Sequence, residues 1–132
     1  MRLLFLCFLF VLRIDAAAGR EQSITVVGEL ICDRKFVGGE VELWEHDFFD
    51  FDDLLNGTKA DGGRFLLFGR ENEFFAITPY VQIKHTCDVR DSRLCYRLTE
   101  FEIPQSKIDG LYDMSIVSLN VRPQNDEEYC DD

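Results

Sequence analysis

The sequence has few of the residues on which several large functional classes depend. Only 2 of its 132 residues are histidines, His46 and His85, which leaves little material for a histidine-built metal or catalytic site. Lysine and arginine number 14 against 25 aspartates and glutamates, a formal net charge of -11 at pH 7, so the basic surface that binds nucleic acid is missing. Only 3 residues are prolines and 46% are hydrophobic, which indicates one globular domain rather than a disordered chain.

Motifs of the common enzyme classes are also absent. The sequence holds no G-x-S-x-G, H-E-x-x-H, P-loop or G-x-G-x-x-G pattern, and no C-x-x-C pair of the kind found in zinc ribbons and thiol oxidoreductases. The acidic run of Asp47, Asp50, Asp52 and Asp53 could supply oxygen ligands for calcium, but it lacks the spacing and central glycine of an EF-hand loop. We therefore expect no catalytic residues, no metal site and no cofactor.

The first residues have the composition of a secretory signal peptide. Arg2 is a short positive start, residues 3–12 form an apolar run, and residues 16–18 are three alanines of the kind found at cleavage sites. An apolar run of this length is too short to span a bilayer, which takes about 20 residues. We expect residues 1–18 to be removed, and residues 19–132 to form a secreted, extracellular domain that does not span a membrane.

Alternation of apolar and polar residues is the dominant pattern of the remaining chain. It predicts seven short strands separated by turn residues, at 24–32, 40–46, 57–60, 64–68, 80–87, 94–103 and 114–121. No helical period persists beyond one or two turns, so the expected fold class is all-β, an antiparallel β-sandwich. His85 shares a face with Val81 and Ile83 and is expected to be a buried, hydrogen-bonded histidine, whereas His46 is expected at an exposed rim. The acidic residues 125–132 are expected to form a solvated tail.

Four cysteines follow the predicted signal peptide, and an even number in an oxidising compartment predicts two disulfides. Cys87 ends one predicted strand and Cys95 begins the next, so an antiparallel hairpin would place these two thiols opposite each other. Hairpin geometry therefore predicts the Cys87–Cys95 bridge, which leaves Cys32 to pair with Cys130.

Phe48, Phe49 and Phe51 stand among the aspartates of residues 47–53. Adjacent phenylalanines point in opposite directions in an extended chain, so at least one should face solvent unless the loop folds back. Exposed aromatic side chains rimmed by charge are typical of an interface core, which predicts that this loop binds a partner. The alternative is that Phe49 or Phe51 plugs the open end of the sandwich.

Asn56-Gly57-Thr58 is an N-x-T sequon in a predicted loop. In an exported chain this sequence predicts glycosylation of Asn56, so the secreted domain would be a glycoprotein.

Four ordered segments share a pattern with a known family. They are VVGELICD at 26–33, VELWEHD at 41–47, DDLLNGTKADGGRF at 52–65 and PYVQIKHTC at 79–87, and Cys95, IP at 103–104, YD at 112–113 and Cys130 follow in order. Together they resemble the nematode transthyretin-like family of secreted proteins. The resemblance implies a transthyretin-like β-sandwich, no established enzymatic activity, and a lipid, hydrophobic or protein partner in the extracellular space.

Two other relationships are weaker. The order Cys32, Trp44, Cys87 is similar to that of immunoglobulin domains, but His85 stands where their tyrosine corner would be. The transthyretin-related enzymes that hydrolyse 5-hydroxyisourate have several site histidines and a Y-R-G-S carboxyl end, whereas this chain ends Y-C-D-D.

We therefore expect a non-enzymatic binding or adaptor protein. The runner-up is an oligomeric small-molecule carrier that resembles transthyretin itself. A monomer is expected, because Pro123 and acidic residues follow residues 114–121 in place of a final edge strand.

Overall fold

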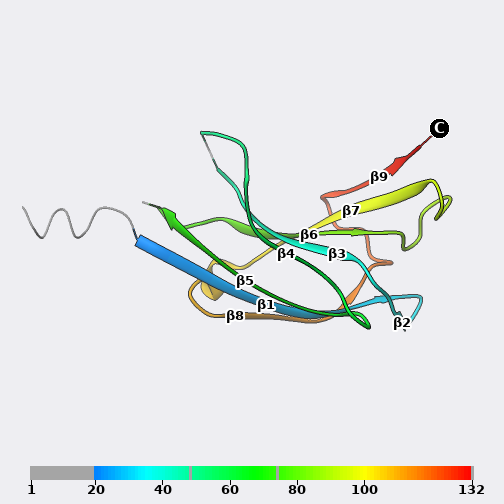
Figure 1. Cartoon of the computed structure of the whole chain (residues 1–132), viewed down its shortest axis with the longest axis horizontal. Coiled ribbons are helices and arrows are strands. Elements are labelled where there is room, and N and C mark those ends of the chain that lie inside the picture. Colours follow the sequence, from blue (N-terminus) through cyan, green and yellow to red (C-terminus); the bar gives the residue numbers. More distant parts are fainter. Residues whose placement is uncertain (1–19, 48, 74, 132) are drawn as a thin grey trace, which may run out of the picture.

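A computed structural model describes residues 20–47, 49–73 and 75–131, so the predicted signal peptide and Phe48 lie outside the described residues. The all-β class is confirmed (Figure 1). The strands are β1 (Arg20–Cys32), β2 (Lys35–Phe36), β3 (Glu40–Glu45), β4 (Asp53–Lys59), β5 (Arg64–Glu73), β6 (Pro79–His85), β7 (Cys95–Glu102), β8 (Leu111–Ser118) and β9 (Asp126–Cys130), with a 3-10 turn at Gln105–Lys107. Strands β2 and β9 are additional to the seven predicted. Within the described ranges, no helix is long and apolar enough to cross a membrane.

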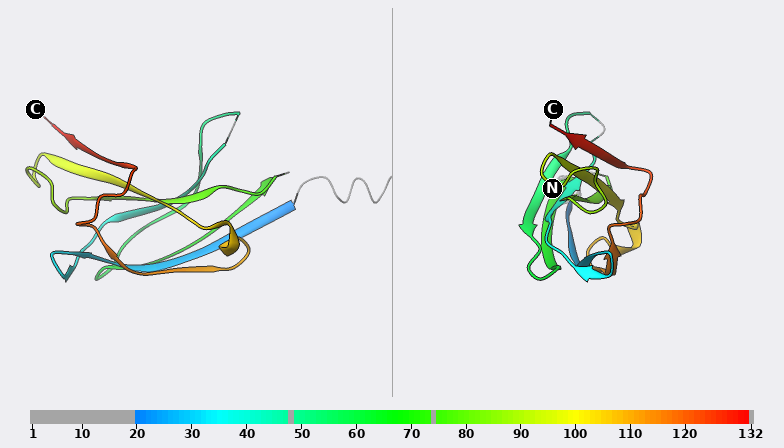
Figure 2. Two further views of the ribbon diagram at one scale, coloured as in Figure 1. Left: turned by 180° about the vertical axis from the view of Figure 1, so that it is seen from behind. Right: turned by 90° about the vertical axis from the view of Figure 1, so that its right-hand side faces the viewer.

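The strands form two sheets that face each other across one core (Figure 2). In the first sheet β1 pairs with β2 and β5 antiparallel and with β8 parallel. The second sheet has the order β4-β3-β6-β7-β9, and all of its pairs are antiparallel. Alternate residues of the strands supply the core, as the sequence pattern predicts. Its fully buried members include Ile24, Val26, Leu30, Val41, Leu43, Val81, Ile83 and Leu119.

The prediction of a solvated acidic tail with no final edge strand is wrong. Strand β9 pairs antiparallel with β7, with Cys95 opposite Cys130 and Thr99 opposite Asp126. The acidic composition hides this strand in the sequence, because Asp126 is buried against the guanidinium of Arg97. A buried partner of opposite charge thus turns an apparently solvated segment into an edge strand.

The predicted disulfide pairing is also wrong. The bridges are Cys32–Cys87, with Cα atoms 5.7 Å apart, and Cys95–Cys130, with Cα atoms 4.0 Å apart. The β6–β7 ladder ends at the pair His85–Arg97, and beyond it the chain turns away at Asp88, which has a φ of 54°. Cys87 therefore reaches the end of β1 across the core, and Cys95 pairs with Cys130 on β9. The Cys32–Cys87 pairing, which the sequence linked to an immunoglobulin-like alternative, occurs in this sandwich.

His85 is a buried, hydrogen-bonded core residue, as predicted, with 5% of its surface exposed. Its Nδ1 accepts the N–H of Cys87 at 3.0 Å, and its Nε2 lies 2.8 Å from Oγ1 of Thr99. An accepting Nδ1 requires the neutral ring, with the proton on Nε2. Burial, and next the positive charge of Arg97, lower the pKa of His85 to about 4.

We expect neutral His85 to make the stability of the protein depend on pH. In the unfolded chain this histidine binds a proton below its ordinary pKa of 6.5, whereas the native chain resists protonation down to about 4. The contribution of His85 to the free energy of unfolding is fully present above pH 6.5. It is lost as the pH falls to 4, and this loss amounts to about 3 kcal/mol. Burial and neighbouring carboxylates raise the pKa of Glu45 to about 7. The contribution of Glu45 to stability therefore changes with pH in the opposite direction over much of the same range.

The His85 contribution is therefore measured as a difference between the wild type and His85→Gln, which keeps a hydrogen-bonding side chain that does not titrate. Urea unfolding from pH 7.5 to pH 4 should show the wild-type advantage shrinking by about 3 kcal/mol. A difference that stays constant over this range would contradict the assignment of a neutral buried ring.

Candidate functional site

The loop between β3 and β4 is shaped by hydrogen bonds from its own aspartates. Oδ1 of Asp47 accepts the N–H of Phe49 at 3.0 Å, and Oδ1 of Asp50 accepts the N–H of Phe51 at 2.7 Å. Short acidic side chains that bond nearby backbone groups favour turns of this kind. The aromatic rings are left in solvent, with Phe49 95% and Phe51 89% exposed. We call residues 47–53 the aromatic loop.

Asp52 fastens the aromatic loop to the second sheet. Its Oδ2 accepts the hydroxyl of Tyr80 at 2.6 Å and lies 3.1 Å from Nδ1 of His46. The imidazole of His46 stacks on the Tyr80 ring with 4.3 Å between centroids, so His46 is half-buried rather than fully exposed at the rim. The Tyr80 hydrogen bond is the main reason that the pKa of Asp52 is lowered. The exposed phenylalanines therefore stand on a fixed base.

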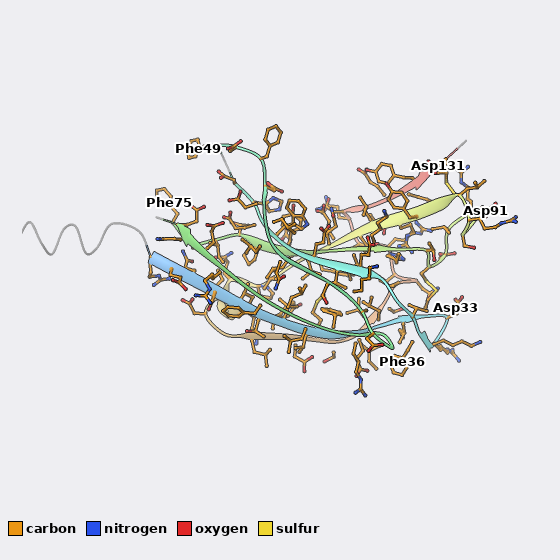
Figure 3. The ribbon with its side chains drawn as sticks, in the orientation of Figure 1. Asp33, Phe36, Phe49, Phe75, Asp91 and Asp131 are labelled. Carbon is orange, nitrogen blue, oxygen red and sulfur yellow. A yellow bond between two sulfur atoms is a disulfide. The ribbon has the colours of Figure 1, made fainter. Side chains whose placement is uncertain are left out.

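The alternative in which Phe49 or Phe51 plugs the sandwich is contradicted by their exposure. Phe75, on the connection between β5 and β6, is 73% exposed. Phe49 and Phe75 both lie at the end of the molecule where β5 finishes, and Phe36 and Asp33 lie at the opposite end (Figure 3). The end where β5 finishes thus presents the more strongly exposed phenylalanines, whereas Phe36 at the other end is 58% exposed.

Four carboxylates meet at the same end of the sandwich. Each of Glu45, Asp53, Glu71 and Glu73 offers one oxygen, and these oxygens all lie within 4.8 Å of one another. Glu45 and Asp53 are paired across the β3–β4 ladder, and the two other glutamates end β5 in the opposing sheet. We call these four residues the carboxylate cluster.

A glycine allows the two sheets to approach closely enough to form the cluster. A Cβ atom at Gly69 of β5 would lie 2.7 Å from Cδ2 of Leu43 and 2.9 Å from Cβ of Leu55. Because no side chain stands there, β4 and β3 pack directly onto β5, and the residues one step further along the strands are brought together. Any larger residue at position 69 would require Leu43 and Leu55 to shift.

The electrostatics of the cluster are unfavourable without a counter-charge. Glu45 is only 4% exposed, and its Oε2 has no hydrogen-bond partner among the described residues. Burial, followed by the charges of Glu73 and Glu71, raises the pKa of Glu45 to about 7. Burial is also the main cause of the raised pKa of Glu71, which lies against Asp53. Crowded carboxylates of this kind require either protons or a cation.

Sequence reasoning missed the cluster, although a signal was present. Glu45 has the same phase in β3 as the buried Val41 and Leu43. Glu71 and Glu73 likewise continue the inward row of Phe65 and Leu67 in β5. The signal is the presence of acidic residues in phase with the buried apolar row of each strand, and it lies outside the run of aspartates in the loop. Of those aspartates, Asp53 alone belongs to the cluster.

Asn56 lies in strand β4 and not in a loop, contrary to the prediction. Its Nδ2 donates to the carbonyl of Phe68 at 2.8 Å and its Oδ1 accepts the N–H of Gly57 at 2.8 Å, although the residue itself is exposed. The strand places Asn56 where β4 borders β5. Glycosylation of its amide stays a prediction from the sequon.

The aromatic loop and the carboxylate cluster both lie in a segment that matches a known protein family. Residues 27–104, which include the aromatic loop and the carboxylate cluster, match the family model of the transthyretin-like family. The chain is 37% identical to transthyretin-like protein 16 of Caenorhabditis elegans over 132 residues, which cover 98% of this chain and 99% of that relative. It is 35% identical to transthyretin-like protein 5 of the same organism over 113 residues, which cover 79% of this chain and 81% of that relative. It is 31% identical to transthyretin-like protein 2, also of that organism, over 127 residues, which cover 85% of this chain and 84% of that relative.

Proposed function

This chain belongs to the transthyretin-like family, and from that premise we propose that it is a secreted, non-enzymatic binding protein of the extracellular space. Its partner is an extracellular protein or a lipid or other hydrophobic ligand, which docks on the aromatic loop. The two disulfides and the signal-like residues 1–18 support the extracellular location.

The observation that carries the proposal is the exposure of Phe49 and Phe51 on a loop whose base is fixed. Large aromatic side chains rarely stand in solvent when packing could bury them, and they supply most of the binding energy where partners dock. The hydrogen bond between Tyr80 and Asp52 lowers the ordering cost of binding, because it already holds the base of the loop.

We expect Phe49→Ser and Phe51→Ser each to weaken partner binding by about 2 kcal/mol, roughly thirtyfold in Kd. Both variants should melt within about 2 °C of the wild type, because these side chains make little contact with the core. The measurement is quantitative capture from the native extracellular fluid with the immobilised protein, followed by a titration with each captured component.

Phe36→Ser is the matched control, because Phe36 is 58% exposed at the opposite end of the sandwich. It removes an exposed phenyl ring without touching the loop, so it should capture the same components with unchanged Kd. Equal losses in all three variants would show non-specific aromatic adhesion. Unchanged capture by Phe49→Ser and Phe51→Ser would exclude the loop as the docking surface.

A carrier with a ligand channel between dimers is the second candidate function. The outer face of the first sheet favours it, because Leu66 and Ile116 are more than 60% exposed beside a hollow of about 680 Å³. Such a carrier requires self-association, whereas the binding protein proposed above acts as a monomer. Size-exclusion chromatography with light scattering separates the two, since the carrier elutes as a tetramer.

A further inference from the structure

We propose that the carboxylate cluster of Glu45, Asp53, Glu71 and Glu73 is a binding site for one calcium ion. The oxygens of the four residues lie within 4.8 Å of one another. Calcium holds its oxygen ligands at 2.3–2.6 Å, so ligands on opposite sides of one ion are separated by about 5 Å. A single ion between the two sheets could therefore contact all four side chains without rearrangement of the strands.

Glu45 provides a second observation that points to a ligand. Its side chain is 96% buried, given an exposure of 4%, and it comes from the inward row of β3. Its Oε2 is buried and has no hydrogen-bond partner among the described residues. A buried carboxylate oxygen without a partner is costly to the fold, and a cation at the cluster would satisfy it directly.

Protein cations do not supply that charge. In the part of the chain that the structure describes, the ion pairs of arginine and histidine involve other carboxylates, and none includes a member of the cluster. Two pairs adjoin the cluster in sequence: Arg70 bonds Glu21, with 3.3 Å between Nη1 and Oε1, and His46 lies against Asp52, with 3.1 Å between Nδ1 and Oδ2. The four acids thus face one another with no basic side chain among them, which is the arrangement of a cation site rather than of a salt-bridge network.

The donor set selects calcium among the common divalent ions. All four donors are carboxylates, which suit hard cations and not zinc, whose sites are usually built with cysteine or histidine. Magnesium requires a near-ideal octahedron and keeps several waters, whereas calcium accepts six to eight oxygens in irregular geometry. The four donors come from three strands of two sheets, so their geometry is irregular. Bidentate binding by some of the carboxylates and a few water molecules would complete the six to eight oxygens.

The test is titration of the full secreted chain with CaCl2 after removal of divalent ions with EGTA, at constant 150 mM ionic strength. Isothermal titration calorimetry should show one calcium per chain, with MgCl2 binding at least tenfold more weakly. Calcium at about 100 times its Kd should raise the melting temperature by roughly 10 °C, because it binds only the folded cluster.

Glu45→Gln keeps the shape of the side chain and removes its charge. In EGTA this variant should melt above the wild type, because one repelled and buried carboxylate is gone, but calcium should no longer raise its melting temperature. Glu71→Gln provides an independent variant if Glu45→Gln does not fold, and it should weaken calcium binding at least tenfold. Glu40→Gln removes the same charge from the exposed start of β3 and should respond to calcium as the wild type does.

Two results would overturn the proposal. One is a wild-type melting temperature that CaCl2 changes no more than NaCl of equal ionic strength. The other is a response to calcium that survives both Glu45→Gln and Glu71→Gln. The site is separable from the proposed docking surface, because Phe49→Ser and Phe51→Ser leave all four carboxylates in place and should bind calcium normally.

Discussion

Replacement of Arg97 by methionine is expected to lower the free energy of unfolding by about 3–5 kcal/mol. Arg97 is fully buried, and its Nη2 and Nε contact the two carboxylate oxygens of Asp126 at 2.8 and 3.2 Å. Its Nη1 also donates to the carbonyls of Cys87 at 2.9 Å and Leu119 at 2.6 Å. Methionine fills a similar volume, but it leaves the buried carboxylate of Asp126 with only the half-exposed Arg122 as its counter-charge, at 3.2 Å, and it leaves two carbonyls without a donor.

Urea unfolding of three variants decides this prediction. The double variant Arg97→Met with Asp126→Leu should recover part of the loss, because the buried carboxylate that has lost its main partner is removed as well. Arg64→Met is the control, since the Arg64 side chain is 80% exposed in its pair with Glu29, and it should change stability by less than about 0.5 kcal/mol. A loss at Arg97 no larger than at Arg64 would mean that the buried pair does not hold β9 in place.

Removal of the Cys32–Cys87 bridge by a double alanine substitution is expected to cost about 4 kcal/mol. The bridged residues are separated by 55 positions, and in the chain-entropy model that cost arises from the greater freedom of the unfolded chain. The second bridge spans 35 positions, so its removal should cost slightly less. Urea unfolding measures both losses, and the circular dichroism of the folded variants should match that of the wild type.

Peptide mapping without reduction provides the direct check of the pairing. A digest should contain a peptide that joins Cys32 to Cys87 and another that joins Cys95 to Cys130. Recovery of a Cys87–Cys95 peptide would contradict the observed arrangement and restore the hairpin pairing that the sequence suggested.

Much of the fold could be predicted because alternation is a local property of a strand. Val41 and Leu43 are buried and Glu42 is not, and His85 is buried with Val81, as their phase predicts. The two short strands could not be predicted in this way. β2 has only two residues, which is too short to show a period, and the acids of β9 conceal a strand that depends on Arg97.

The disulfide pairing and the carboxylate cluster depend on contacts between distant residues, which no local pattern records. Cys87 and Cys95 flank a hairpin in the sequence, but β9 pairs with the other edge of β7 and brings Cys130 opposite Cys95. The cluster joins residues of β3, β4 and β5, and its formation depends on the absence of a side chain at Gly69. The sequence allows Phe49 to be exposed or to plug the sandwich, and the exposure of its side chain in the structure decides between the two.

The parallel pairing of β1 with β8 has a consequence for how the protein folds. Thr25 pairs with Leu111 and Ile31 with Ser118, so one edge of the first strand has no partner until the ribosome has made β8, which follows much later in the chain. Contacts this distant in sequence slow folding into the millisecond-to-second range, because a long loop must close before they form. Until then the bare edge of β1 can pair with another nascent chain, and we expect folding assistance to matter most during that interval.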